Sequence, residues 1–347
     1  MHGGDIYRND VELDFSVNIN SKGIPDRVKE ALKDAIEKCT CYPDIQAERL
    51  KKAIAQMNKI DEQTLVFGNG ASELFLALIR ALKPKKALIP VPSFYGYEKA
   101  LASSQCETIY YEMKEEENFC LTERFLEQLT DKVDVLFLTN PNNPVGNCVD
   151  RVLLEKIIQR CNRNNITVIL DECFIEFTEE GQEGSFMHKT KRYPNVIVVR
   201  AFTKIFSIPG VRLGYLICQD HQLKKKILDQ LPEWNLSVFA QEAGYAATKE
   251  TEFIKETISA TKKEREYLIK ELKSLGIKVY EGRANFLLLY TEENLAEKLL
   301  EKKILIRDCS NFRGLKKGFY RIAVKKREEN IILIKEIKKI MEKKGQV

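Results

Sequence analysis

The feature that most constrains the fold of this chain is a regular alternation of short apolar runs with amphipathic helical segments. Near-continuous apolar runs that alternate with helices are typical of parallel strands buried on both faces. The alternation therefore predicts an α/β fold with a doubly wound, mostly parallel sheet. The runs are Thr64–Phe67, Ala87–Val91, Val133–Leu138, Ile166–Leu170 and Val196–Val199.

Residues that could bind a ligand or take part in a reaction lie at or just after the ends of these runs. They are Gly70, Phe94, Asn143, Asp171 and Lys204. Ligands of doubly wound sheets bind outside the carboxyl ends of the strands, so one pocket is expected to collect all five. Each residue alone has an ordinary alternative as a turn residue, a core aromatic, a helix cap, a salt bridge or a surface lysine. The prediction of a site therefore depends on their convergence.

The segment after the last run predicts a covalent ligand. Thr203 and Lys204 follow this strand closely, and Arg212 comes eight residues after Lys204 in a Pro-Gly-x-Arg-Leu-Gly loop. A lysine beside a hydroxyl and an arginine suits an imine with a phosphate-bearing aldehyde. The small-residue loop 68–72 opens a helix, where backbone N–H groups and the positive end of the dipole also favour phosphate.

A second unit is predicted after residue 246. The helical segment Glu252–Leu275 is long enough to bridge two domains, and a smaller α+β domain follows it. Arg307 and Arg321 lie at or beside strands of this unit, and arginine forks suit carboxylates and phosphates. An ordinary interface salt bridge is the alternative for each. The predicted strands are Lys278–Tyr280, Asn285–Tyr290, Ile304–Arg307 and Tyr320–Val324.

Composition excludes several classes of function. A net charge of +5 is spread over helical segments that are also rich in acids, which predicts no nucleic-acid partner. No signal peptide is recognised, and no apolar run approaches the ~18 residues of a membrane span. Nine cysteines without a CxxC pair indicate reduced thiols in the cytoplasm. Cys39 and Cys41 have no nearby histidine, so no metal site is expected.

Four motifs together resemble those of fold-type I pyridoxal-phosphate enzymes, in the aminotransferase class I/II superfamily. They are Asn-Pro-Asn-Asn143-Pro-x-Gly, Asp171-Glu-x-aromatic, Thr-Lys204 and Arg212-Leu-Gly, with Arg321 near the end. The resemblance covers essentially the whole chain. It implies a large domain with a mostly parallel seven-stranded sheet and a smaller α+β domain. The implied regions are an N-terminal arm with part of the small domain in 1–40, the large domain in 41–245 and the small domain in 246–347.

The resemblance also implies a role for each motif residue toward pyridoxal 5'-phosphate. Lys204 would bind the cofactor covalently and then move protons, while Asp171 would keep the pyridine nitrogen protonated. Asn143 would hydrogen-bond the ring hydroxyl, and Phe94 would stack on the ring. Tyr42 would reach the phosphate in the neighbouring subunit, which implies a homodimer with shared sites. The residues implied to hold the phosphate are Ala71, Ser72, Thr203 and Arg212.

One departure from the family pattern concerns Phe174. Many aminotransferases have a tyrosine three residues after the aspartate, which donates to the ring hydroxyl. Phenylalanine cannot donate, so this hydrogen bond is expected to be absent and the electronics of the cofactor to differ.

Within the superfamily, the sequence is most similar to the L-threonine-O-3-phosphate decarboxylases of cobalamin biosynthesis. The likeness rests on His2-Gly-Gly, the segment 14–20, Ile208-Pro-Gly, Gly282-Arg-Ala-Asn285 and Ile304-Leu-Ile-Arg307. It implies decarboxylation of L-threonine O-3-phosphate to (R)-1-amino-2-propanol O-2-phosphate. Arg321 would bind the substrate carboxylate. The residues implied to contact the phosphorylated amino acid are His2, Gly3, Asn18, Asn143, Arg307 and Arg321.

Two other functions stay open at this point. Histidinol-phosphate aminotransferases are the next most similar family, and their reaction begins with the same lysine and cofactor. Whether carbon dioxide or the α-hydrogen leaves depends on the geometry in which the substrate's anionic groups are bound, and a sequence pattern does not give this geometry. A regulatory protein that keeps the fold and cofactor is the third possibility. Such proteins usually carry a DNA-binding module, and no helix-turn-helix extension is recognised in this sequence.

Overall fold

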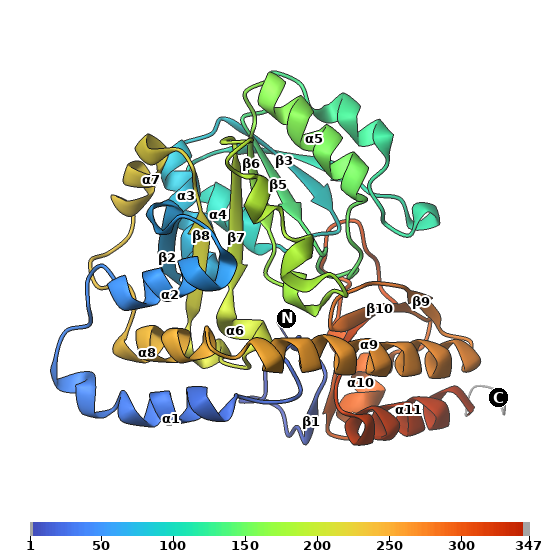
Figure 1. The fold of residues 1–347 in the computed structure, drawn as a ribbon. Helices are drawn as coiled ribbons and strands as arrows, with labels where there is room; N and C mark the ends of the chain where they lie inside the picture. Colours follow the sequence, from blue (N-terminus) through green and yellow to red (C-terminus); the bar gives the residue numbers. More distant parts are fainter. Residues whose placement is uncertain (1–2, 343–347) are drawn as a thin grey trace.

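Two sheets of different size form the framework of the protein (Figure 1). The structure is a computed structural model, and it describes residues 3–342. The long helix α9 (Thr251–Ser274) runs beneath both sheets and connects the larger unit to the smaller one (Figure 1). Among the described helices, none combines the length and the apolar character that a membrane span requires.

The larger sheet has seven strands in the order β2-β8-β7-β6-β5-β3-β4. Strand β8 pairs antiparallel with both neighbours, and the other pairings in the sheet are parallel. The predicted seven-stranded, mostly parallel sheet is therefore confirmed. The strands are β2 (Leu65–Asn69), β3 (Lys86–Val91), β4 (Glu107–Glu112), β5 (Val135–Thr139), β6 (Thr167–Asp171), β7 (Val196–Ala201) and β8 (Leu213–Ile217).

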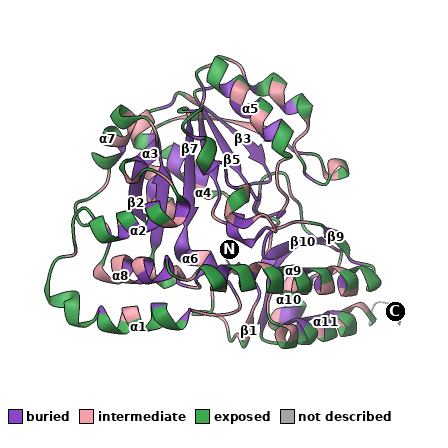
Figure 2. Ribbon diagram, in the orientation of Figure 1, coloured by how far each residue is buried: buried purple, intermediate pink, exposed green. Residues whose placement is uncertain are grey.

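Helices cover both faces of this sheet, so its central strands are buried (Figure 2). Successive strand residues point to opposite faces, and Val168 and Ile169 of β6 accordingly join two different apolar clusters. One face packs against α2 (Glu48–Asn58), α5 (Arg151–Arg163) and α8 (Val238–Ala247). The other face packs against α3 (Ala71–Leu82), α4 (Gly96–Ala102) and α7 (His221–Leu228). Helix α1 (Asp26–Asp34) lies beside α8 (Figure 1).

The smaller unit contains an antiparallel sheet in the order β12-β13-β10-β9. Its apolar face packs against α9, α10 (Leu295–Leu300) and α11 (Arg327–Glu342). Phe15 from the N-terminal segment joins the same cluster, so the chain start is built into this unit. The strands are β9 (Lys278–Tyr280), β10 (Phe286–Tyr290), β12 (Arg307–Asp308) and β13 (Phe319–Ala323).

Two predicted elements differ from the structure. The predicted strand Ile304–Arg307 is interrupted, because β11 (Ile304–Leu305) pairs with β1 (Leu13–Asp14), whereas β12 pairs with β13. The two halves therefore belong to different sheets. Gly23 and Pro25 in the sequence predict a helix from Pro25 to about Cys39, but the helix ends at Asp34 and a short 3-10 turn follows it. The domain boundaries near residues 40 and 245 stay a prediction.

Candidate active site

A cavity of about 250 Å³ opens at the carboxyl ends of the parallel strands. Strand ends meet there in register, since Thr139 lies opposite Asp171 and Asp171 lies opposite Val199. The cavity also borders the N-terminal segment and the β12–β13 sheet, so both units contribute to it. The sequence-predicted residues that line it are Gly3, Asn18, Ala71, Ser72, Phe94, Asn143, Asp171, Thr203, Lys204, Arg212, Arg307 and Arg321.

One end of the cavity is built to bind an anion. Helix α3 begins after Gly70, which has no side chain to cap the first backbone N–H groups. Gly70 is not itself a lining residue, but the guanidinium of Arg212 lies against it, and an added Cβ would come within 2.3 Å of Arg212 Nη2. Gly214 lets β8 approach equally closely, since a Cβ there would lie 2.6 Å from the Ala71 nitrogen. The Arg-Leu-Gly motif thus places a cation beside free donors at a helix N-terminus.

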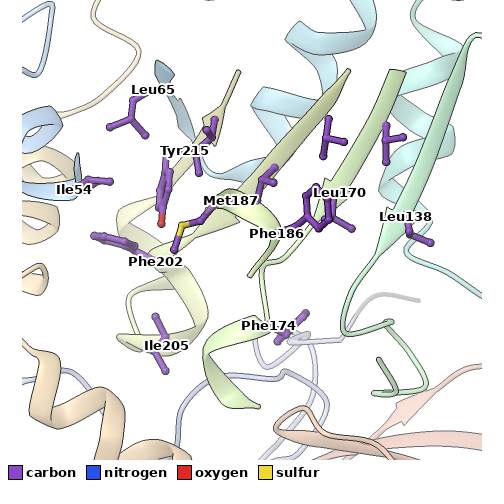
Figure 3. Close-up of a cluster of buried hydrophobic side chains, with 14 of the residues drawn as sticks. Ile54, Leu65, Leu138, Leu170, Phe174, Phe186, Met187, Phe202, Ile205 and Tyr215 are labelled. Carbon is purple, nitrogen blue, oxygen red and sulfur yellow. The ribbon is translucent and has the colours of Figure 1, made fainter. Parts of the chain in front are cut away.

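Lys204 is fixed by the residues on either side of it. Phe202 and Ile205 of α6 (Phe202–Ile205) are buried in the core, with Phe202 beside the ring of Tyr215 (Figure 3). The Asn20 backbone N–H donates to the Lys204 carbonyl at 3.1 Å, which holds the loop from the other side. Burial, with the positive charge of Arg321, lowers the pKa of Lys204 to about 8. A substantial fraction of the amine is therefore neutral near physiological pH.

Asp171 is buried, and its carboxyl group is surrounded by donors. The Tyr97 hydroxyl donates to Asp171 Oδ2 at 2.6 Å, and the Cys173 backbone N–H donates to Oδ1 at 3.0 Å. Burial raises the pKa of Asp171 above its usual value, although these hydrogen bonds and the charge of Lys204 oppose the shift. Burial and the Asp171 charge in turn raise the pKa of Tyr97 well above its usual value, so Tyr97 remains a donor.

Two arginines line the cavity side by side on neighbouring strands. Arg307 of β12 lies directly opposite Arg321 of β13, and both are buried. Arg307 Nη2 donates to Asn311 Oδ1 at 2.8 Å, and Arg321 Nη2 donates to the Ser16 carbonyl at 2.8 Å. In the described part of the chain neither guanidinium is hydrogen-bonded to a carboxylate. Burial and the neighbouring Arg307 lower the pKa of Arg321 to about 10.

The N-terminal segment closes this end of the cavity. The Gly4 N–H donates to Ser16 Oγ at 2.7 Å, and a Cβ on Gly3 would lie 2.5 Å from the Ser16 carbonyl oxygen. Asn18 is buried, and its Oδ1 has no hydrogen-bond partner among the described residues. The same is true of Arg321 Nε. Two buried cations and the unpaired donor Arg321 Nε favour an anionic ligand, and the unpaired acceptor of Asn18 favours a donor on the same ligand.

Aromatic residues and an amide form the walls between the two ends. Phe94 has room for its ring because position 96 is glycine, where a Cβ would lie 2.3 Å from a ring atom. Asn143 accepts a short hydrogen bond from Arg321 Nη1. Phe174 lines the cavity and packs edge-on against Phe286 with 5.1 Å between ring centroids. The position expected to lack a hydroxyl donor is therefore part of the cavity wall.

Two sequence-predicted residues are not placed at this cavity. Tyr42 is 81% exposed and packs against Trp234, with 4.9 Å between ring centroids. Its predicted role lies in a neighbouring subunit, so that role stays a prediction. His2 lies outside the described residues. Conversely, Tyr97 and Cys173 belong to the site without having been expected there. A buried aspartate requires donors, but nothing in the sequence shows which residues supply them.

The arrangement fits pyridoxal 5'-phosphate. The cofactor has a phosphate, an aldehyde and a ring nitrogen that acquires positive charge. The cavity offers the free helix N-terminus with Arg212 and Thr203, the partly neutral amine of Lys204, and the Asp171 carboxylate. Each group of the cofactor thus has a residue of matching chemistry.

Comparisons with known proteins give concordant findings. The family described as aminotransferase class I and II matches residues 10–337. The threonine-phosphate decarboxylase of Salmonella typhimurium is 36% identical over 98% of this chain and 96% of its own length. The solved histidinol-phosphate aminotransferase of Clostridium acetobutylicum has a TM-score of 0.90 and 34% identity, covering 95% of this chain and 99% of that one. The solved L-threonine-O-3-phosphate decarboxylase of Porphyromonas gingivalis has a TM-score of 0.84 and 26% identity, with the same coverage.

Proposed function

This chain belongs to the family of class I and II aminotransferases, and we propose that it decarboxylates L-threonine O-3-phosphate. It is an enzyme that depends on pyridoxal 5'-phosphate. The observation that carries the proposal is the pair of buried arginines, Arg307 and Arg321, on adjacent strands. Threonine phosphate has two anionic groups, a carboxylate and a phosphate, and two guanidinium groups in one cavity match them. The amine phosphate that results is assigned to cobalamin side-chain synthesis as part of the same proposal.

Each of the two arginines is assigned to one anionic group of the substrate. Arg321 is hydrogen-bonded to Asn143, which is proposed to contact the cofactor ring. Arg321 is therefore assigned to the carboxylate, which is bonded to the same carbon as the reacting amine. Arg307 is assigned to the phosphate, which lies further along the substrate. Asn18 lines the same cavity and is assigned to the phosphorylated substrate as well, since its amide Nδ2 can donate to an anion.

The other residues prepare and complete the reaction. When bound, the cofactor supplies an electron sink for the charge left on the substrate's α-carbon. Asp171 would hold a positive charge on the ring nitrogen by pairing with it. The neutral amine of Lys204 would bond the aldehyde. Once the substrate's amine has displaced it, Lys204 would hold a proton released from the substrate's ammonium group and would deliver that proton to the α-carbon. Fixing both anions limits rotation of the substrate, so that the bond to the carboxylate is the one presented for cleavage.

A second candidate function is the aminotransferase reaction of histidinol phosphate. It is favoured by the TM-score of 0.90 to the Clostridium acetobutylicum enzyme. Histidinol phosphate has a single anionic group, because its phosphate ester stands where an amino acid has the carboxylate. It would therefore leave one of the two buried arginines without an anion. This mismatch is the reason for preferring the decarboxylase.

The proposal includes a homodimer in the cytoplasm. Ile36, Tyr42, Ile45 and Trp234 are large apolar residues that are 60%, 81%, 54% and 43% exposed. Ile45 and Trp234 also line a surface hollow of about 320 Å³. Exposed apolar residues favour a protein interface, and Tyr42 in such an interface would reach a neighbouring site. All nine cysteines are free, which agrees with a reducing compartment.

A comparison of two substrates tests the function. We expect kcat/KM for carbon dioxide release from L-threonine O-3-phosphate to exceed kcat/KM for amino transfer from histidinol phosphate to 2-oxoglutarate. Arg307→Met should lower the first value roughly 100-fold, since a charge-assisted contact contributes about 3 kcal/mol. Arg313→Met is the matched control, because Arg313 is an exposed arginine that packs on Tyr110. A preference for histidinol phosphate, or an equal effect of both variants, would contradict the proposal.

A further inference from the structure

Tyr97 is a fully buried tyrosine that does not line the cavity, and its hydroxyl is hydrogen-bonded to the carboxylate of Asp171. Its hydroxyl donates to Asp171 Oδ2 at 2.6 Å and lies 2.7 Å from Thr139 Oγ1. Thr139 Oγ1 lies 3.1 Å from Ser93 Oγ. Tyr97 has one proton, and that proton is given to Asp171. Thr139 must therefore donate to Tyr97, and Ser93 must donate to Thr139.

This order creates a chain of hydroxyl groups that ends at a carboxylate. Each donor polarises the next, so the last hydrogen bond is stronger than an isolated one. The residues come from three elements: Ser93 follows β3, Thr139 ends β5 and Tyr97 lies in α4. The hydroxyl chain therefore forms only when these elements are packed in the native arrangement.

Cys173 supplies the second set of donors to the same carboxylate. Its backbone N–H donates to Asp171 Oδ1 at 3.0 Å, and its thiol lies beside the Asp171 carboxyl group. Both oxygens of Asp171 thus have a donor from the protein. Cys173 additionally lines the cavity, so its side chain is close to any bound ring.

Asp171 can pair with a charged ring nitrogen only while it is ionised. It is buried, and burial favours the protonated form. The groups that face it are Tyr97 from α4, Thr139 through Tyr97, Cys173 after β6 and Lys204 from α6. The protein must therefore supply the stabilisation that water would give to an exposed carboxylate.

We propose that Tyr97 and Cys173 are positioning residues that keep Asp171 ionised and directed into the cavity, and thereby set the affinity for the cofactor's charged ring. Tyr97 carries the larger share, because an O–H donor to a carboxylate is stronger than a thiol. The inference rests on the cofactor and not on the identity of the substrate. Its failure is therefore distinguishable from failure of the proposed decarboxylation.

The test measures binding of pyridoxal 5'-phosphate to the apoprotein between pH 5 and 8. Tyr97→Phe should weaken binding roughly ten- to hundredfold, the effect of losing a hydrogen bond to a charged group. Removing a donor lets Asp171 take up its proton at a higher pH. The loss of affinity on acidification should therefore begin about one pH unit higher in the variant. The absorption band of the bound cofactor should shift its pH midpoint in the same direction.

Tyr215→Phe is the matched control. Tyr215 is also fully buried in the large unit, and its hydroxyl accepts from Asn58 Nδ2 at 3.3 Å without contacting Asp171. It should keep the wild-type affinity and pH profile. Equal losses in both tyrosine variants, or an unchanged profile in Tyr97→Phe, would overturn the inference.

Cys173 provides a second pair of variants if Tyr97→Phe fails to fold. Cys173→Ala should weaken cofactor binding by a few fold, and Cys173→Ser should restore it because a hydroxyl replaces the thiol as donor. Weak binding in both variants would mean that only the size of the side chain matters, and this result would also overturn the inference.

Discussion

Replacement of Glu172 by glutamine should make the protein more stable at pH 8 while changing little at pH 5 and below. Glu172 follows Asp171 in sequence and is fully buried. It accepts from the Phe186 backbone N–H at 2.8 Å and is bonded to the Ser185 hydroxyl. Burial raises its pKa from the ordinary 4.5 to about 7, although the charge of Arg200 opposes this shift.

The direction of this stability change follows from proton binding in the folded and the unfolded protein. Between pH 4.5 and about 7 the folded protein keeps the proton on Glu172, whereas the unfolded chain releases it. The stabilising contribution is therefore complete below pH 4.5 and is lost as the pH rises to about 7. A difference of about 2.5 pK units corresponds to about 3 kcal/mol. Glutamine matches the protonated form in shape and does not titrate, so the variant avoids this loss.

Urea unfolding at pH 5 and pH 8 measures the difference. From pH 5 to pH 8, the free energy of unfolding of the wild type should fall by roughly 2 to 3 kcal/mol more than that of Glu172→Gln. Glu127→Gln is the control, because an exposed substitution should stay within about 0.5 kcal/mol of wild type at both values. Parallel pH profiles for wild type and Glu172→Gln would refute the reasoning, since they would show that this carboxyl is already ionised in the fold.

Two further predictions concern the cofactor site. Gly70→Ala should weaken cofactor binding at least tenfold, because its Cβ would displace Arg212. Gly276→Ala is the control: its backbone strain is similar (φ +74° against +78° at Gly70), but it has open space around it, so it should bind the cofactor normally. Equal affinities of the two variants in a fluorescence titration would contradict this prediction. Lys204→Ala should be inactive, and mixing it with Tyr42→Ala should restore roughly a quarter of the wild-type activity if one subunit completes the site of its partner. No gain on mixing would argue against shared sites.

Much of the large unit could be predicted from sequence, because the patterns that specify its strands and helices lie in short contiguous segments. Apolar runs between helices specify buried parallel strands, and register brings their ends together. The positions of Phe94, Asp171 and Lys204 after three such runs therefore predict one shared cavity, and all three residues line it. Arg307 and Arg321 were expected only as anion-binding candidates. Their cross-strand pairing depends on the sheet order, which the sequence pattern does not reveal.

The failures of prediction arise where long-range contacts decide the outcome. Ile304–Arg307 has the pattern of one strand, but its halves pair with β1 and β13, which are distant in sequence. Tyr97 gave no signal of its own, because the hydroxyl chain requires β3, β5 and α4 to be packed together. Sequence patterns report which face of an element is buried, but they do not report which polar group that face meets.

The fate of the substrate's carboxyl carbon tests the central claim most directly. The holoenzyme is incubated with L-threonine O-3-phosphate labelled with carbon-13 at the carboxyl group, and the products are followed by NMR. Binding of both anions by the two arginines predicts that the label appears in carbon dioxide and bicarbonate, while the organic product is an unlabelled amine phosphate. Retention of the label in a keto acid, with the amino group transferred to the cofactor, would show that the α-hydrogen is lost instead and would contradict the account.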